Sequence, residues 1–186
     1  HPFTWASGWK SPIYCDNRKT LSYPEVRTYI RDQFVNLIKT KYPQVELIAG
    51  VATGAIAQGA LVAQELGLPF VYVRSAAKNH GLENLIEGEY KEGQKVVVVE
   101  DLISTGGSSL QAVEALRNAG CDVLGMVAIF TYGFQKAIDN FTNAHCVLDT
   151  LSDYNAMIDL AQKTGYVQES DVAKLKEWRL SPESYK

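Results

Sequence analysis

The sequence has no apolar run long enough to cross a membrane. A transmembrane helix needs about 20 predominantly apolar residues, whereas a run such as the four valines at 96–99 has only the length of a strand. Hydrophobic residues make up 46% of the 186 residues and charged residues 21%, which are ordinary proportions for a folded domain. We therefore expect a globular protein without a membrane partner, and we exclude a disordered chain.

The chain also lacks an excess of positive charge. It carries 18 Lys and Arg against 21 Asp and Glu, which gives a formal net charge of −3. A protein that binds nucleic acid needs clustered Lys and Arg to neutralise the phosphates. We therefore expect no nucleic-acid partner, although a local basic site for a small anion is compatible with this charge.

Cysteine is scarce. The three cysteines, Cys15, Cys121 and Cys146, are far apart and form no C-x-x-C pair. This spacing favours neither a zinc site nor a redox pair. Free thiols fit a reducing compartment, so we predict a cytoplasmic protein with no metal ligands of its own. The chain begins at His1 and not at Met, so we expect that its natural N-terminus is missing.

Short apolar runs alternate with segments of helical periodicity between about residues 45 and 150. Strands that alternate with helices predict an α/β protein with a mostly parallel, doubly wound sheet flanked by helices. The expected strands are Val45–Val51, Pro69–Val73, Lys95–Val99, Asp122–Phe130 and Ala144–Leu148, and the expected helices between them are Gly54–Leu66 and Gly106–Ala119.

The two ends of the chain differ from this core. An early proline and a capping pattern predict a helix from Ser22 to about Tyr42. The segment before it is irregular or a small hairpin, and residues 151–178 contain two amphipathic helices. We interpret residues 1–186 as a single domain, with a core at about 23–150 and a small hood formed by about 1–22 plus the C-terminal helices. The polar connection Ser75–Glu92 is long enough to be a functional lid.

One segment carries the clearest chemistry. Two acids, Glu100 and Asp101, follow the four valines, and a loop rich in Ser, Thr and Gly then opens a helix. Glycines let backbone N–H groups approach an anion, hydroxyls add donors, and a helix N-terminus adds partial positive charge. The loop predicts a phosphate cradle, but it is not a Walker A loop because no lysine follows the glycines. Carboxylates beside a phosphate suit sugar hydroxyls or a metal-bound water.

This segment resembles the 5-phosphoribosyl 1-pyrophosphate (PRPP) motif of type I phosphoribosyltransferases. Two further segments resemble the orotate phosphoribosyltransferases in particular: Phe-Thr-Trp-Ala-Ser-Gly-Trp-Lys-Ser-Pro-Ile-Tyr-Cys-Asp-Asn-Arg at residues 3–18, and Val-Arg-Ser-Ala-Ala-Lys-Asn-His-Gly at residues 73–81. The resemblance covers the chain from Phe3 to about Lys136. It implies the type I phosphoribosyltransferase fold with a hood over the site.

The resemblance also implies an activity. Members of the family transfer ribose 5-phosphate from PRPP to N1 of orotate, which gives orotidine 5′-monophosphate and pyrophosphate and leads to UMP in pyrimidine biosynthesis. Mg²⁺ is carried by PRPP. The transition state resembles an oxocarbenium ion, so the protein positions the substrates and stabilises the charge of the leaving group. The family works as a homodimer, in which the lid acts in trans on the neighbouring subunit.

The roles of individual residues follow from the same resemblance. Lys78, His80 and Asp101 are the expected catalytic residues. Orotate would meet Ser104, Lys10, Arg18 and Tyr132. PRPP would bind to the pyrophosphate turn at Thr53, to the lid, to the two acids and to the cradle, that is to Thr53, Arg74, Lys78, His80, Glu100, Asp101, Leu102, Ile103, Ser104, Thr105, Gly106, Gly107 and Ser108.

Three positions depart from the pattern of the family. Ala76 stands where the lid commonly carries a second lysine, Ala6 replaces a lysine found in another branch, and Tyr132 replaces an arginine. Two alternatives therefore stay open. One is a purine phosphoribosyltransferase of the same fold, and the other is a PRPP-binding regulator without catalysis, against which the acidic charge and the Lys78–His80 lid both argue.

Overall fold

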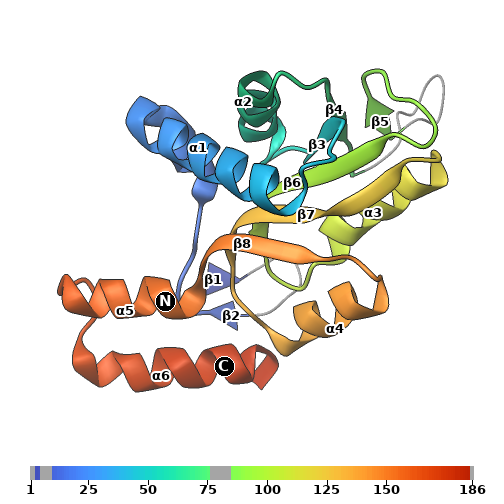
Figure 1. Cartoon of the computed structure of the whole chain (residues 1–186). Helices are drawn as coiled ribbons and strands as arrows, with labels where there is room; N and C mark the ends of the chain where they lie inside the picture. The colour runs from blue at the N-terminus through green and yellow to red at the C-terminus, as the bar shows by residue number, and fades with distance from the viewer. Residues whose placement is uncertain (1–2, 5–9, 76–84, 185–186) are drawn as a thin grey trace.

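The computed structural model describes residues 3–4, 10–75 and 85–184, and its centre is one twisted sheet (Figure 1). Within this part of the chain the sheet has six strands in the order β5-β4-β3-β6-β7-β8, all parallel except β5, which runs antiparallel to β4. The strands are β3 Leu47–Val51, β4 Phe70–Val73, β5 Ile86–Glu87, β6 Lys95–Ile103, β7 Asp122–Thr131 and β8 Leu148–Asp153.

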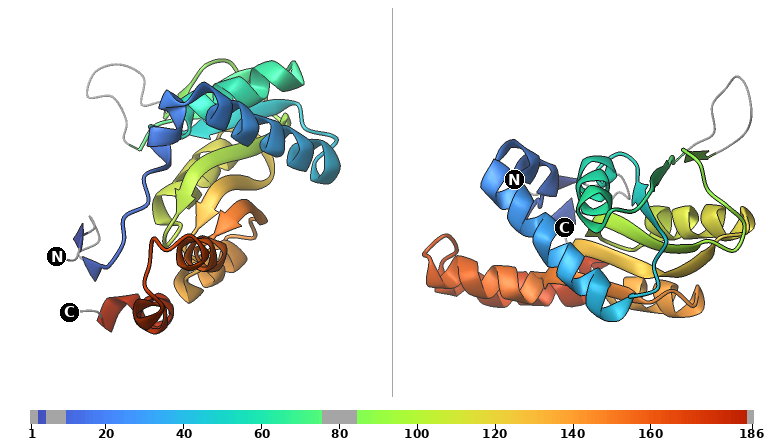
Figure 2. Two further views of the ribbon diagram at one scale, coloured as in Figure 1. Left: turned by 90° about the vertical axis from the view of Figure 1, so that its left-hand side faces the viewer. Right: turned by 45° about the horizontal axis from the view of Figure 1, so that its top comes forward.

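Helices cover both faces of the sheet, as two views show (Figure 2). One face packs against α1 and α2, and the other packs against α3 and α4. The helices are α1 Pro24–Lys41, α2 Ile56–Leu66, α3 Gly107–Asn118, α4 Gln135–Asn143, α5 Tyr154–Lys163 and α6 Glu169–Leu180, with 3₁₀ turns η1 at Asn17–Ser22 and η2 at Pro182–Ser184. The doubly wound parallel sheet expected from the sequence is confirmed.

The central strand β6 shows why the sheet is parallel and buried. Its four valines at 96–99 are fully buried. Val96 and Val98 pack in the core on the side of α3 and α4, while Val97 and Val99 pack on the side of α1 and α2. Because successive side chains of a strand point to opposite faces, a strand covered on both sides needs an unbroken apolar run.

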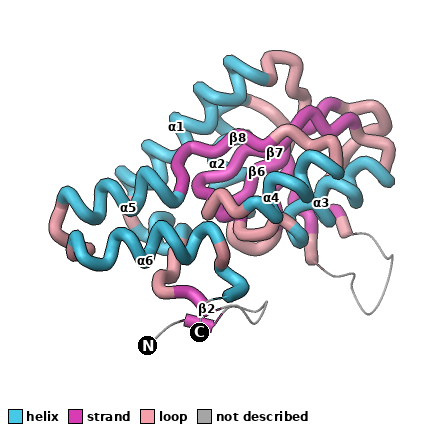
Figure 3. The backbone as a smooth tube through the Cα atoms, turned by 90° about the horizontal axis from the view of Figure 1, so that it is seen from below, coloured by secondary structure: helices cyan, strands magenta, loops and turns pink. Residues whose placement is uncertain are grey.

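A third, aromatic cluster joins the ends of the chain. Trp178 of α6 packs edge-on against Tyr132, and its indole Nε1–H donates a hydrogen bond of 3.1 Å to the carbonyl of Lys10. Lys10 belongs to β2 (Lys10–Ser11), which pairs with β1 (Phe3–Thr4). The helices α5 and α6 lie side by side near this strand pair (Figure 3). The C-terminal helices and the N-terminal strand pair therefore pack together.

The last predicted strand, Ala144–Leu148, is wrong. The unpredicted helix α4 ends at this point, where the N–H groups of Ala144, His145 and Cys146 donate to the last carbonyls of the helix. His145 turns the chain with a φ of +48°, and β8 begins only at Leu148. Apolar residues that close a helix were read as a strand, because a run this short carries no clear period.

Two further features differ from the sequence prediction, and one agrees with it. Strand β6 continues through the two acids to Ile103, and the long polar connection contains the short strand β5. Gly120, predicted as the glycine after a helix, adopts a φ of +85° behind α3, which confirms that position. No helix in the described ranges is both long enough and apolar enough to cross a bilayer.

Candidate active site

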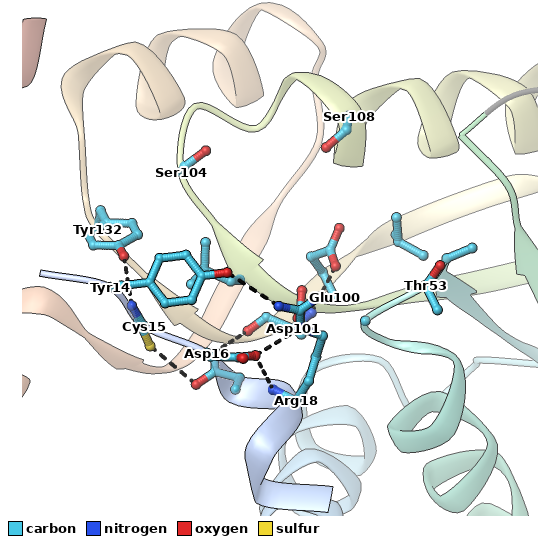
Figure 4. Close-up of a pocket in the computed structure, with 15 residues that line it drawn as sticks. Tyr14, Cys15, Asp16, Arg18, Thr53, Glu100, Asp101, Ser104, Ser108 and Tyr132 are labelled. Atoms are coloured by element: carbon cyan, nitrogen blue, oxygen red, sulfur yellow. Dashed lines mark hydrogen bonds and ion pairs between the residues drawn. The ribbon is translucent and has the colours of Figure 1, made fainter. Parts of the chain in front are cut away.

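A cavity of about 650 Å³ opens beyond the carboxyl ends of β3, β6 and β7 (Figure 4). This is the place where open parallel sheets bind their ligands. Its walls come from the segment before η1, the turn after β3, the end of β6, the loop before α3 and the residue after β7. The lining residues are Tyr14, Cys15, Asp16, Asn17, Arg18, Val51, Ala52, Thr53, Gly54, Glu100, Asp101, Leu102, Ser104, Ser108 and Tyr132.

The two acids of β6 point in different directions. The pleat of the strand continues from the valines, so Glu100 faces α3 and Asp101 faces the side of α2 and η1. Glu100 is only 5% exposed, and its Oε2 accepts a hydrogen bond of 2.7 Å from the hydroxyl of Ser109. Its Oε1 accepts the backbone N–H of Asp101 at 2.9 Å. Burial raises the pKa of the Glu100 carboxyl well above its usual range.

Asp101 is half-buried, and its carboxylate lies over the backbone of Gly54. A Cβ atom at position 54 would stand 2.3 Å from Oδ2 of Asp101, so with any other residue here the carboxylate would have to move. The turn after β3 therefore needs a glycine here so that the carboxylate can approach the backbone. Thr53, on the same turn, also lines the cavity.

The loop between β6 and α3 forms the cradle that the sequence predicted. Ser104 and Ser108 line the cavity at its two ends. Gly106 has a φ of +80° and packs against Phe141, so a Cβ there would meet the ring at 2.6 Å. The carbonyl of Thr105 accepts a hydrogen bond of 2.8 Å from Asn140 of α4. Ile103 is fully buried, so only its backbone can face the loop.

The segment before η1 and the first residues of η1 close the opposite side of the cavity. Arg18 has a half-exposed side chain (56%), and its Nε lies 2.8 Å from Oδ1 of Asp16, which also caps η1. The hydrogen bond from Arg18 is the main cause that lowers the pKa of Asp16. Tyr132 is only 2% exposed, and its hydroxyl oxygen accepts the backbone N–H of Cys15 at 3.4 Å.

Two of the predicted basic residues, Arg74 and Lys10, do not line the main cavity. Arg74 lines a neighbouring cavity of about 490 Å³ that shares Ser108 with the first, and it pairs with Glu87 at 3.5 Å. Lys10 is exposed on β2 and does not line the main cavity. Lys78 and His80 lie outside the described residues, as does Ala76. In the ranges that the structure describes, no three His, Cys, Asp or Glu side chains gather as metal ligands.

Comparison with known proteins gives the family. Residues 21–159 match the family model described as a phosphoribosyl transferase domain. The chain is 64% identical over 182 residues to an orotate phosphoribosyltransferase of Bacteroides thetaiotaomicron, which covers 98% of this chain and 86% of the relative. It is 57% identical over 178 residues to the enzyme of the same name from Staphylococcus saprophyticus. This match covers 96% of this chain and 88% of the relative. This chain belongs to the orotate phosphoribosyltransferase family.

A solved structure agrees with this assignment. The crystal structure of orotate phosphoribosyltransferase from Aeropyrum pernix superposes with a TM-score of 0.78 at 27% identity, over 89% of this chain and 91% of that one. The chain is therefore a phosphoribosyltransferase by sequence and by fold. The resemblance inferred from the PRPP motif, the hood segment and the lid is confirmed.

The site of this orotate phosphoribosyltransferase also contains residues that sequence reasoning passed over. Tyr14, Cys15, Asp16 and Asn17 line the cavity, and all four belong to the segment quoted for the resemblance, although only Arg18 was given a role. Gly54 was likewise missed. These residues are close neighbours in sequence of Arg18 or Thr53, and this proximity could have indicated that they line the cavity.

Proposed function

We propose that this chain transfers ribose 5-phosphate from PRPP to N1 of orotate and releases pyrophosphate. One observation carries the proposal: Asp101, Ser104 and Ser108 face one cavity at the carboxyl end of the sheet, in a chain whose relatives are named for this reaction. The chemistry needs two substrates held in contact and leaving-group charge stabilised, and little covalent work from the protein.

The ribose 5-phosphate part of PRPP would occupy the centre of the cavity. Ser104 to Ser108, with the free N–H groups at the start of α3, would bind the 5-phosphate. Asp101 and Glu100 would accept hydrogen bonds from the ribose hydroxyls. Asp101 is the more accessible of the two, because both oxygens of Glu100 already accept hydrogen bonds. Glu100 would then contribute mainly by holding α3 against β6.

Pyrophosphate would leave past the turn at Thr53, towards the neighbouring cavity that Arg74 lines. Lys78 and His80 of the lid would join Arg74 there and stabilise the developing negative charge. We also propose that the protein works as a homodimer with the lid acting in trans. Mixing a Lys78→Ala variant with an Asp101→Asn variant tests this arrangement. Part of the activity returns if each subunit's lid serves the other's cavity, and none returns if the lid acts within its own subunit.

Orotate would lie between the cradle and the segment before η1. Its carboxylate needs a cation, and Arg18 is the better candidate because it lines the cavity, whereas Lys10 does not. Ser104 and the buried ring of Tyr132 would contact the base. Of these contacts, the one between Arg18 and the carboxylate requires Arg18 to leave its ion pair with Asp16.

Mg²⁺ would arrive with PRPP. The oxygen-rich walls around Asp101 suit a hard cation, and the diphosphate and water would supply most of its ligands. When bound, the ion neutralises charge on the departing pyrophosphate. We further propose that the enzyme acts in the reducing cytoplasm, which fits the three free thiols of Cys15, Cys121 and Cys146.

The direct test is the consumption of orotate, followed by its ultraviolet absorbance in the presence of PRPP and Mg²⁺. We expect a loss of absorbance that requires PRPP, and no reaction when adenine or hypoxanthine replaces orotate. Consumption of a purine but not of orotate would overturn the assignment in favour of a purine phosphoribosyltransferase. Binding of PRPP without consumption of any base would indicate a regulator.

A further inference from the structure

The side chain of Asn17 bridges the hood and the central strand. Asn17 begins η1, and its amide Nδ2 donates a hydrogen bond of 2.7 Å to the backbone carbonyl of Asp101 on β6. The bond joins two residues that are 84 positions apart in the sequence. Asn17 also lines the main cavity, so the bridge lies at the wall of the site itself.

A second hydrogen bond fixes the orientation of the Asn17 amide. The thiol of Cys15 donates to Oδ1 of Asn17 at 3.4 Å. Burial, followed by the nearby charges of Asp101 and Asp16, raises the pKa of Cys15 to about 11, so the thiol keeps its proton at neutral pH and can donate. With Oδ1 accepting from Cys15, Nδ2 is the atom left to point at Asp101.

The local structure of η1 does not depend on this amide. Asp16 caps the turn by accepting the backbone N–H of Arg18, and the hydroxyl of Thr20 donates to the carbonyl of Asn17 at 2.6 Å. The turn is therefore held by other groups. What the side chain of Asn17 adds is a contact with Asp101.

Asp101 therefore has close neighbours on two sides. Its carboxylate lies against the backbone of Gly54, and its carbonyl accepts the hydrogen bond from Asn17. In the same segment, the backbone N–H of Cys15 donates a hydrogen bond to the hydroxyl of Tyr132, whose ring would contact the base. The hood segment is therefore tied to the ends of both β6 and β7.

We propose that Asn17 is a positioning residue that sets Asp101 relative to the base-facing wall of the cavity. The inference rests on the proposed function, in which Asp101 meets the ribose and the base lies beside Cys15. The bond that forms in the reaction joins the ribose to the base. An error in the spacing of these two walls therefore acts directly on the reacting atoms.

The sharpest test compares Asn17→Asp with Asn17→Ala. Aspartate has the shape of asparagine but cannot donate when ionised, and it places a negative oxygen against the carbonyl of Asp101. We expect kcat/KM for PRPP to fall by about tenfold or more in Asn17→Asp and by less in Asn17→Ala. Asn36→Asp, which adds the same charge on the exposed side of α1, is the matched control and should behave as the unaltered chain.

Two further readouts decide between positioning and simple packing. The unfolding temperature should change by no more than about 2 °C in either variant, and the affinity for PRPP, measured by calorimetry, should fall in the same order as kcat/KM. Packing alone predicts that the isosteric aspartate is tolerated better than alanine, and that order would overturn the proposal. Losses of kcat/KM that are fully explained by a lower unfolding temperature would also overturn the proposal.

The calorimetric measurement separates this inference from the proposed function. If the unaltered chain binds PRPP but consumes no orotate, the proposed function fails while the order of PRPP affinities still tests Asn17. If the unaltered chain does not bind PRPP, both fail together.

Discussion

The hydroxyl of Ser109 donates a hydrogen bond of 2.7 Å to Oε2 of Glu100, which ties the first turn of α3 to the middle of the sheet. Both side chains are buried. The cradle lies between these two residues in the sequence, so the bond closes a loop whose backbone must hold its shape to receive a phosphate. A buried polar contact therefore supports the part of the cavity proposed to bind the 5-phosphate.

Removal of the Ser109 hydroxyl should destabilise the protein. Ser109→Ala leaves a buried carboxyl oxygen without its partner, and such a loss costs about 1–3 kcal/mol in the free energy of unfolding. Denaturant unfolding measures this directly. Ser170→Ala, on the exposed face near the start of α6, is the control and should have little effect. Equal stability of the two variants would show that Glu100 does not need the hydroxyl.

The raised pKa of Glu100 gives a prediction about pH. Burial holds the folded-state pKa above the ordinary value of 4.5, so the native state binds more protons than the unfolded state above that pH. The stability contributed by protonated Glu100 is fully present below pH 4.5 and is lost as the pH rises through the folded-state pKa. We expect Glu100→Gln to gain in unfolding temperature relative to the unaltered chain as the pH rises. A constant difference across pH would contradict the shift.

Gly54→Ala should impair binding of PRPP. A Cβ at this position would fall 2.3 Å from Oδ2 of Asp101, so the carboxylate must move or the turn after β3 must shift. We expect the affinity for PRPP to fall by about tenfold or more, because the ribose contact moves with Asp101. Titration calorimetry with PRPP provides the measurement. Unchanged affinity would mean that Asp101 is not held where the ribose binds.

Arg74→Ala should weaken the binding of pyrophosphate more than the binding of orotate. Arg74 is paired with Glu87 beside the proposed exit for pyrophosphate. Loss of its side chain would remove a positive charge that stabilises the bound pyrophosphate anion. We expect the inhibition constant for pyrophosphate to rise by about tenfold, in line with the loss of one charged hydrogen bond. Arg31→Ala removes an arginine that is also ion-paired, to Asp32 and Glu65, and serves as the control. A similar effect of both variants would indicate a general effect of charge.

Ala76→Lys should raise the turnover of the enzyme. The resemblance to the family places a second lid lysine at position 76, and a cation there would add to Arg74, Lys78 and His80. A donor in a tight site is worth about 3–4 kcal/mol, and we expect the gain from Ala76→Lys to be smaller than this. The rates of orotate consumption by the two proteins give the contribution of the lysine. A lower rate in Ala76→Lys would mean that this branch has no place for the second cation.

The sequence was sufficient for the central part of the fold. The four valines of β6 were predicted as a strand, and this is confirmed, whereas the continuation of the strand through the two acids was not predicted. The cavity collects Thr53, Asp101, Ser104 and Tyr132 from three separate segments because the carboxyl ends of parallel strands meet at one edge.

What the sequence could not provide were contacts between distant segments. Asn17 lies in an irregular stretch without hydrophobic period, so nothing in the pattern links it to Asp101. The end of α4 was read as a strand for a related reason, since Ala144 and Cys146 are apolar in either structure. The burial of Glu100 under α3 depends on packing that only the folded chain reveals.

The most direct measurement is titration of the protein with PRPP in the presence of Mg²⁺, for the unaltered chain and for Asp101→Asn. The account expects the unaltered chain to bind PRPP, and it expects the affinity to fall by about tenfold or more in Asp101→Asn at an unchanged unfolding temperature. Equal affinity in the two proteins would contradict the central claim, because the cavity around Asp101 would then not be the site where PRPP is held.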